Sequence, residues 1–138
     1  MISPRFIPAM EDTPELLRAM PHLDTEVAVL VPNIRYYHEL EKHDHEKVNT
    51  VALFVSASEA YSQSNTKMTK QRAFDSAREV AEAALVDGFH LRGYLSYSFR
   101  DVEGEVPMDT EVVLRDAQAL LEMGCTRIIL SGTDGRST

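Results

Sequence analysis

The chain has 138 residues, 43% of them hydrophobic, and this length predicts a single domain over residues 1–138 with a core of ordinary size. Its 14 Lys and Arg residues stand against 22 Asp and Glu residues, and the formal net charge of −8 repels nucleic-acid phosphates and anionic lipids. The single Cys125 excludes an internal disulfide, and no stretch reaches the roughly 20 apolar residues of a membrane span. We therefore expect no nucleic-acid partner, no membrane association, and a location in the cytosol or an organelle matrix.

Four apolar runs, most of them rich in β-branched residues, are predicted as strands: residues 26–32, 48–56, 90–96 and 127–131. Most are apolar on both faces, which is typical of parallel strands covered on both sides. The last of them begins just after Cys125, which we interpret as a small buried core residue.

Helical patterns lie between these runs. One spans residues 69–88, and its apolar face is predicted to hold Ala73, Phe74, Ala77, Val80, Ala81, Ala84 and Leu85. Another runs from the N-cap candidates Asp109 and Thr110 to Gly124, with an apolar face of Val112, Val113, Ala117, Leu120 and Leu121. Weaker helices are expected at residues 34–43 and 14–20, the second with Thr13 as a possible N-cap and Pro14 at its first position.

Regular alternation of helices and strands predicts an α/β fold of right-handed βαβ units, about four parallel strands in all. Two architectures fit: a small open doubly wound sheet, or a partial (β/α)8 TIM barrel, since a whole barrel typically needs about 250 residues. In both, ligands approach the carboxyl ends of the strands.

Polar residues follow each predicted strand. They are Asn33 after the first strand, Ser56 to Glu59 after the second, residues 96–100 after the third and residues 131–134 after the fourth. Such groups could hydrogen-bond a polar ligand, but loops are polar in any case, and the serines could instead cap the following helix.

Arg92, within the third strand, needs a partner or a pocket, and a salt bridge to Glu59 or another acid is the structural alternative. Gly93 beside it would let backbone or ligand approach closely. The His43-Asp44-His45 run carries zinc-type ligands, but it lies in a dense charge cluster, which favours a solvated connection. The turn from Gly132 to Gly135 lacks the Lys and the spacing of a phosphate-binding loop.

Five short strings occur in an order and spacing that resemble the 3-hydroxy-3-methylglutaryl-coenzyme A lyase family, a branch of the metal-dependent aldolase-type barrels. They are Pro4-Arg5-Phe6-Ile7-Pro8, Leu30-Val31-Pro32-Asn33, Phe54-Val55-Ser56-Ala57-Ser58-Glu59 with Asn65, Arg92-Gly93-Tyr94-Leu95-Ser96, and Met123-Gly124-Cys125. The resemblance implies a (β/α)8 barrel of which this chain contains the third to sixth strands.

The resemblance also implies a divalent cation, Mg²⁺ or Mn²⁺, which polarises substrate oxygens while a carbon–carbon bond is cleaved to release acetyl-coenzyme A. The family's metal ligands and catalytic Cys lie in segments without a counterpart here, so we expect no catalytic residue and no metal bound by this chain alone. Within the matched region, Lys67 replaces an Asn, and Ser131-Gly132-Thr133 replaces Gly-Asp-Thr. The run from Tyr97 to Gly104 keeps only Glu103-Gly104 of the family motif.

By resemblance, eight residues are expected to line the substrate side of the pocket: Asn33, Ser56, Ser58, Glu59, Asn65, Arg92, Tyr94 and Thr133. The leading hypothesis is a truncated lyase-like barrel that is inactive by itself and associates with itself or a covering partner through its open sheet edges. The alternatives are a non-catalytic module that binds an acyl-coenzyme A, a remnant without ligand, and a divergent enzyme using Glu59, Arg92 and Asp134 without metal.

Overall fold

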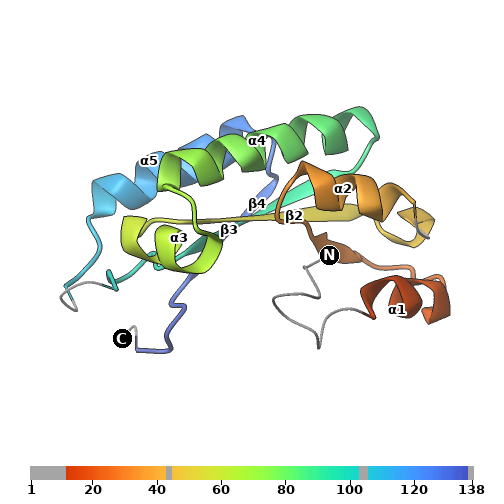
Figure 1. Cartoon of the computed structure of the whole chain (residues 1–138), viewed down its shortest axis with the longest axis horizontal. Coiled ribbons are helices and arrows are strands. Elements are labelled where there is room, and N and C mark those ends of the chain that lie inside the picture. Colours follow the sequence, from red (N-terminus) through yellow and green to blue (C-terminus); the bar gives the residue numbers. More distant parts are fainter. Residues whose placement is uncertain (1–11, 43–44, 103–105, 137–138) are drawn as a thin grey trace.

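The computed structural model describes residues 12–42, 45–102 and 106–136, apart from the side chain of residue 45 (Figure 1). The elements follow in the order α1 (Thr13–Ala19), β1 (Ala28–Leu30), α2 (Ile34–Glu41), a 3-10 turn (His45–Lys47), β2 (Thr50–Ser56), α3 (Glu59–Thr66), α4 (Lys70–Val86), β3 (His90–Ser96), α5 (Thr110–Glu122) and β4 (Arg127–Ser131). The Pro4 to Pro8 string, the His43-Asp44-His45 run and Glu103-Gly104 fall wholly or largely outside the described residues.

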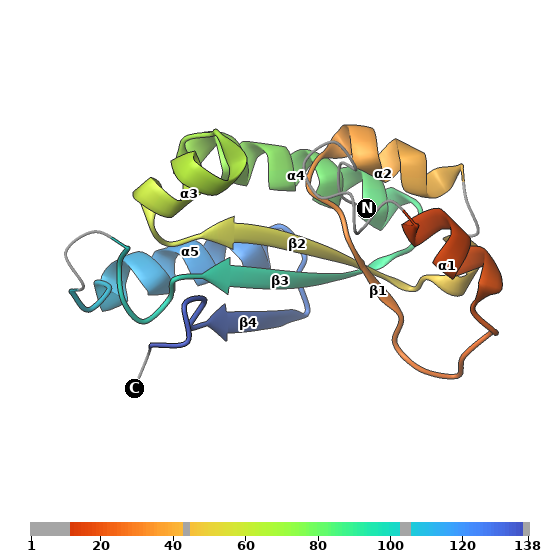
Figure 2. The same cartoon turned by 60° about the horizontal axis from the view of Figure 1, so that its bottom comes forward.

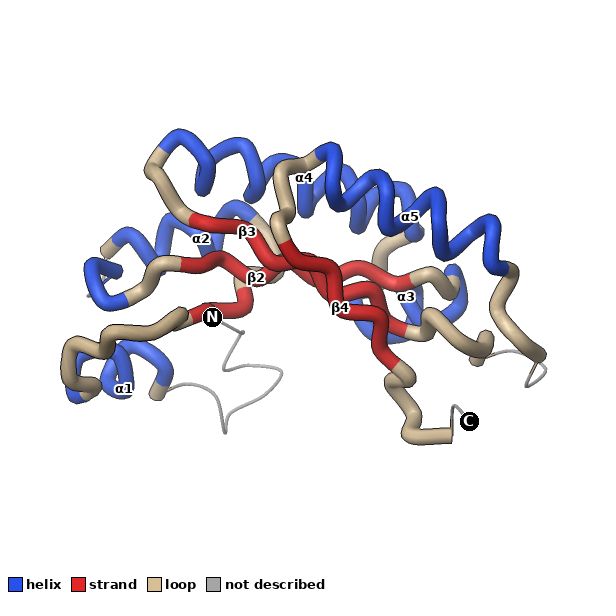
Figure 3. Tube along the Cα trace, turned by 180° about the vertical axis from the view of Figure 1, so that it is seen from behind, coloured by secondary structure: helices blue, strands red, loops and turns tan. Residues whose placement is uncertain are grey.

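The four strands form one parallel sheet in the sequential order β1-β2-β3-β4. Helices α2, α4 and α5 lie together on one face of this sheet, and none of these three covers its opposite face (Figures 1 and 3). A doubly wound sheet reverses its strand order and carries helices on both faces, whereas successive barrel units do neither. The chain is therefore a partial (β/α)8 barrel, and the doubly wound alternative is wrong.

The helix ends predicted from local signals are confirmed for the two long helices. The Thr69 side chain accepts a hydrogen bond from the Arg72 N–H (3.3 Å), and Asp109 accepts one from the Glu111 N–H (2.9 Å), as N-caps do. Beyond α5, Gly124 has a φ of +100°, a left-handed conformation that favours glycine. At α1 the Thr13 N-cap is wrong by one residue, because Thr13 is already helical and Asp12 precedes it.

Two elements differ from the sequence expectation. β1 spans only three residues, Ala28–Leu30, because its pairing with β2 runs only from Thr50 to Ala52. The segment between β2 and α4 forms a separate helix, α3, whose polar sequence shows no apolar periodicity. Lys67 ends α3 with a left-handed φ of 60°.

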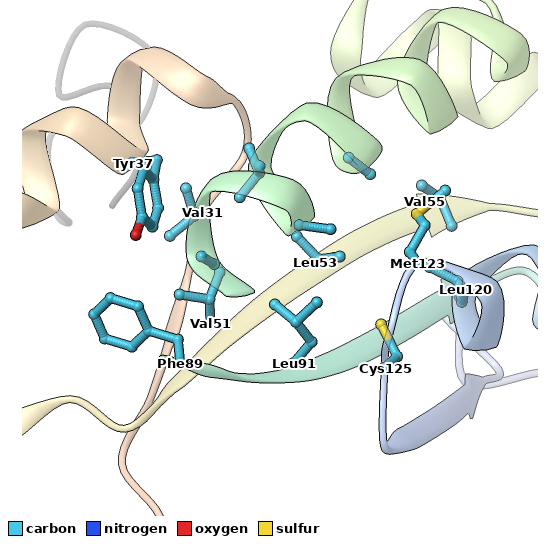
Figure 4. Close-up of a cluster of buried hydrophobic side chains, with 14 of the residues drawn as sticks. Val31, Tyr37, Val51, Leu53, Val55, Phe89, Leu91, Leu120, Met123 and Cys125 are labelled. Carbon is cyan, nitrogen blue, oxygen red and sulfur yellow. The ribbon is translucent and has the colours of Figure 1, made fainter. Parts of the chain in front are cut away.

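The core lies between the sheet and its helices (Figure 4). It includes Val31, Tyr37, Val51, Leu53, Val55, Phe89, Leu91, Leu120, Met123 and Cys125. Two residues placed on apolar faces from the sequence, Leu85 and Leu121, are instead 47% and 55% exposed. On α5 the inward positions are three or four residues apart, so the buried face runs through Val113 and Leu120 and includes a polar residue, Asp116.

Close approach at Gly93 comes from side chains of α5, of β4 and of the segment between them. A methyl group at Gly93 would lie 3.1 Å from both Leu120 Cδ1 and Ile128 Cδ1 and 3.3 Å from Cys125 Sγ. The buried Cys125 is the core residue that the sequence predicts, and burial raises the pKa of its thiol to about 11. Among the described helices, none is long and apolar enough to cross a bilayer.

Candidate functional site

The carboxyl ends of β2, β3 and β4 lie side by side at one edge of the sheet (Figure 2). Their last residues pair in register, Ser56 with Ser96 and Ser96 with Ser131, so three serines form a row. Asn33 follows β1 at the same end and caps α2, where its side chain accepts a hydrogen bond from the Tyr36 N–H (3.3 Å). The sheet therefore brings together the strand-end polar residues that the sequence singled out.

The loop after β2, from Ser56 to Glu59, is held by its own hydroxyl groups. Ser56 Oγ donates to the Ser96 carbonyl (3.4 Å) and accepts from the Ser58 N–H (3.0 Å). Ser56 is 4% exposed and Ser58 is 1% exposed. In this conformation both hydroxyls serve to fix the loop, and neither is open to solvent.

Ser58 is the N-cap of α3 and connects this helix to the segment after β3. Its hydroxyl accepts from the Tyr61 N–H (3.2 Å) and donates to Asp101 Oδ1 (2.5 Å). Asp101 also accepts from the Val102 N–H (2.7 Å). Sequence reasoning missed Asp101, since no local pattern around it indicates a partner 43 residues away.

Three predicted site residues are exposed at this end of the molecule: Glu59, Asn65 and Thr133. The Glu59 carboxylate accepts from Gln63 Nε2 (2.8 Å) and from the Lys70 N–H (3.1 Å), which ties the loop to the start of α4. Thr133 Oγ1 accepts from the Tyr97 N–H (3.0 Å). Their exposure leaves these groups available to a ligand that approaches the strand ends.

Tyr97, directly after β3, has a backbone conformation that the sequence did not reveal. Its φ of 54° is left-handed, a strained conformation for a residue with a bulky side chain. Its ring lies 4.5 Å from the Tyr61 ring between centroids, and burial raises the pKa of Tyr61. Such outliers cluster at binding sites, where surrounding contacts enforce them.

Arg92 and Tyr94 occupy a different part of the strand. Arg92 lies four residues before the end of β3, about 13 Å from the carboxyl edge at the rise of a strand. Arg92 Nη2 pairs with Glu26 Oε1 at 2.6 Å, and Nη1 donates to the Tyr94 hydroxyl at 3.3 Å. The acid that pairs with Arg92 is thus Glu26 and not Glu59, and the hydrogen bond from Arg92 lowers the pKa of Glu26.

A surface hollow of about 490 Å³ lies at the amino ends of the strands. It is lined by Glu26, Asn49, Thr50, His90, Thr126 and Arg127. In barrels of this type the amino end serves stability and the carboxyl end holds the site. We therefore place the candidate site at the carboxyl ends of the strands and not in this hollow.

The part of the chain that the structure describes holds no group of three or more His, Cys, Asp or Glu residues that could bind a metal ion. Cys125 is buried in the segment between α5 and β4, before the amino end of β4 and therefore away from the carboxyl ends of the strands. The described residues therefore do not fit a divalent-cation site of their own.

No family model matches the chain, but the chain is similar to curated and solved HMG-CoA lyases. A hydroxymethylglutaryl-CoA lyase of Pseudomonas mevalonii is 32% identical over 136 residues, 97% of this chain and 44% of the relative. The crystal structure of the HMG-CoA lyase from Brucella melitensis superposes with a TM-score of 0.90 at 30% identity, over 99% of this chain and 47% of that one. The chain is similar to one part of an HMG-CoA lyase.

A further HMG-CoA lyase, from A. baumannii, was solved in complex with coenzyme A and 3-methylmalate. It superposes with a TM-score of 0.81 at 24% identity, over 94% of this chain and 41% of that lyase, a likeness that concerns the fold alone. The chain thus spans less than half the length of the lyases that it matches.

Proposed function

We propose that this chain forms the strand-end wall of an acyl-coenzyme A pocket in an HMG-CoA lyase type barrel. The observation that carries the proposal is the superposition of 99% of the chain on a lyase barrel, with its polar residues at the carboxyl edge of the sheet. The lyase complex with coenzyme A supports the class of ligand. Residues 1–138 act as one domain in this proposal, located in the cytosol or an organelle matrix.

The eight predicted residues take two kinds of role in this proposal. The exposed groups of Glu59, Asn65 and Thr133 contact the ligand, since each can exchange water for a polar ligand atom. The buried hydroxyls of Ser56 and Ser58 hold the loop in place. Asn33 fixes the start of α2. Arg92 and Tyr94 hold each other in place on the sheet face opposite to α2, α4 and α5.

A divalent cation, which the family resemblance implies, would supply charge stabilisation for a developing enolate. Because the described residues do not fit such a site, we assign them no step of bond cleavage. Their contribution is to bind and orient a thioester.

Calorimetric titration of the chain with coenzyme A tests the binding role. We expect saturable heat that is reduced in Glu59→Ala and Thr133→Ala, and unchanged in the control Gln118→Ala, whose exposed side chain on α5 donates to Glu122. A chain that gives no heat and no thermal shift with coenzyme A would remove the proposal.

Assay of the same chain with HMG-CoA and Mg²⁺ or Mn²⁺ tests the catalytic role. We expect acetoacetate at background rates, because the described residues lack a cation site. Release of acetoacetate well above background would show that this chain cleaves the carbon–carbon bond by itself, and it would overturn the proposal that the chain only binds and orients the thioester.

We further propose that a second copy or another covering partner pairs with the open sheet edges. Within the described sheet, β1 and β4 each have a strand neighbour on one side only, and Leu130 on β4 is 44% exposed. Unpaired strand edges tend to associate. Sedimentation equilibrium should give a mass above the 15.5 kDa monomer that rises with concentration, and a monomer at every concentration would exclude self-association.

A further inference from the structure

Lys70, the first residue of α4, reaches two other parts of the molecule with its side chain. Its ammonium group donates to the Ala57 carbonyl (3.1 Å) and forms an ion pair with Asp116 on α5. Its own backbone N–H donates to Glu59 (3.1 Å). One residue thus holds the loop of Ser56 to Glu59 at two points and ties it to a distant helix.

Both members of this ion pair occupy positions that local rules disfavour. A cation at the first residue of a helix opposes the helix dipole, which favours acids there. Asp116 is 4% exposed on the face of α5 that otherwise packs into the core, where apolar residues are expected. Residues that break local rules and satisfy each other point to a task beyond helix formation.

We propose that Lys70, held by Asp116, is a positioning residue for the Ser56 to Glu59 loop. The inference rests on the proposed function, in which this loop forms part of the pocket wall. With side-chain exposures of 16% for Lys70 and 6% for Asp116, the pair is poorly screened by water. Asp116 balances the ammonium charge, so that the remaining N–H bonds can be directed at the Ala57 carbonyl.

A purely structural pair would stabilise the packing of α4 on α5 and nothing more. A structural role and a loop-positioning role predict different results when apolar side chains replace the ion pair. Exchanging a buried ion pair for apolar side chains of similar size is often neutral or stabilising for the fold. The same exchange removes the donor to the Ala57 carbonyl, and no apolar group can replace it.

The test is therefore the double variant Lys70→Met/Asp116→Leu, with Lys70→Met alone as a companion that leaves the buried Asp116 without its Lys70 partner and with the exposed Arg115, 3.8 Å away, as a nearby cation. Lys47→Met is the matched control, because the Lys47 ammonium group also donates to backbone carbonyls, those of Leu17 and Arg18, but lies before the amino end of β2, away from the loop. Thermal unfolding and residue-resolved amide hydrogen exchange are measured for each.

We expect the double variant to melt near the parent temperature while the Ala57 and Ser58 amides exchange roughly tenfold to a hundredfold faster, the effect of losing one charged hydrogen bond. Amides in the middle of β2, such as Leu53, should be unchanged. Lys47→Met should lower the melting temperature without affecting the loop. Unchanged exchange at Ala57 and Ser58 in a folded double variant would overturn the proposal.

Coenzyme A binding provides the second arm. If the parent chain binds coenzyme A, the double variant should bind at least about fivefold more weakly, and equal affinity would show that the loop position does not depend on Lys70. If the parent chain binds none, the proposed function fails. The exchange measurement still decides whether Lys70 positions the loop.

Discussion

Removing the Ser58 hydroxyl tests the connection that fixes the candidate site. Ser58→Ala deletes the N-cap bond from the Tyr61 N–H, worth about 1 kcal/mol, and the bond to the Asp101 carboxylate, worth about 1.5–3 kcal/mol. Both bonds share one oxygen, and Asp101 keeps the Val102 N–H as a donor, so the terms do not add in full. We expect a loss of about 2–3 kcal/mol in the free energy of unfolding.

Urea denaturation followed by circular dichroism measures this loss, and the melting temperature should fall by about 6–12 °C for a chain of this size. The matched control is Ser64→Ala on the same helix, where an exposed hydroxyl donates only to the Tyr61 carbonyl (3.1 Å). The control should change stability by less than about 0.5 kcal/mol. Equal effects of the two substitutions would refute the role of Ser58 as the link between α3 and Asp101.

Three further expectations concern residues outside this link. Burial raises the pKa of Cys125 to about 11, so the unfolded chain loses the thiol proton at lower pH than the native chain does. The free energy of unfolding should therefore fall as pH rises from about 9 toward 11, and it should fall less in Cys125→Ala. The hydrogen bond from Arg92 lowers the pKa of Glu26, so the Glu26 carboxylate stabilises the fold above the ordinary carboxyl pKa. This stabilisation is lost as pH falls through the pKa of Glu26 in the native chain, and the loss should be missing from the acid denaturation of Glu26→Gln. Lys67→Gly, at a left-handed φ of 60°, should raise the urea midpoint by the equivalent of about 0.5–1 kcal/mol, and a lower midpoint would contradict strain at this position.

The sequence by itself determined those elements whose signals lie within a few neighbouring residues. The strands His90–Ser96 and Arg127–Ser131 have the predicted bounds, because short apolar runs bounded by polar or turn residues are typical of strands. The N-caps Thr69 and Asp109 were predictable for the same reason, since a cap bonds an N–H only two or three residues away. Because the strands are parallel and pair in chain order, the serines that end them, Ser56, Ser96 and Ser131, lie in one row.

Only the tertiary structure decided which polar groups meet. Arg92 could pair with any acid until the fold placed Glu26 beside it, 66 positions earlier in the chain. The burial of Ser58 against Asp101, and of Lys70 against Asp116, likewise joins residues that are more than 40 positions apart. Such pairs leave no periodic trace, because their energy depends on the desolvated geometry that arises when the loops and helices of separate βα units are packed together.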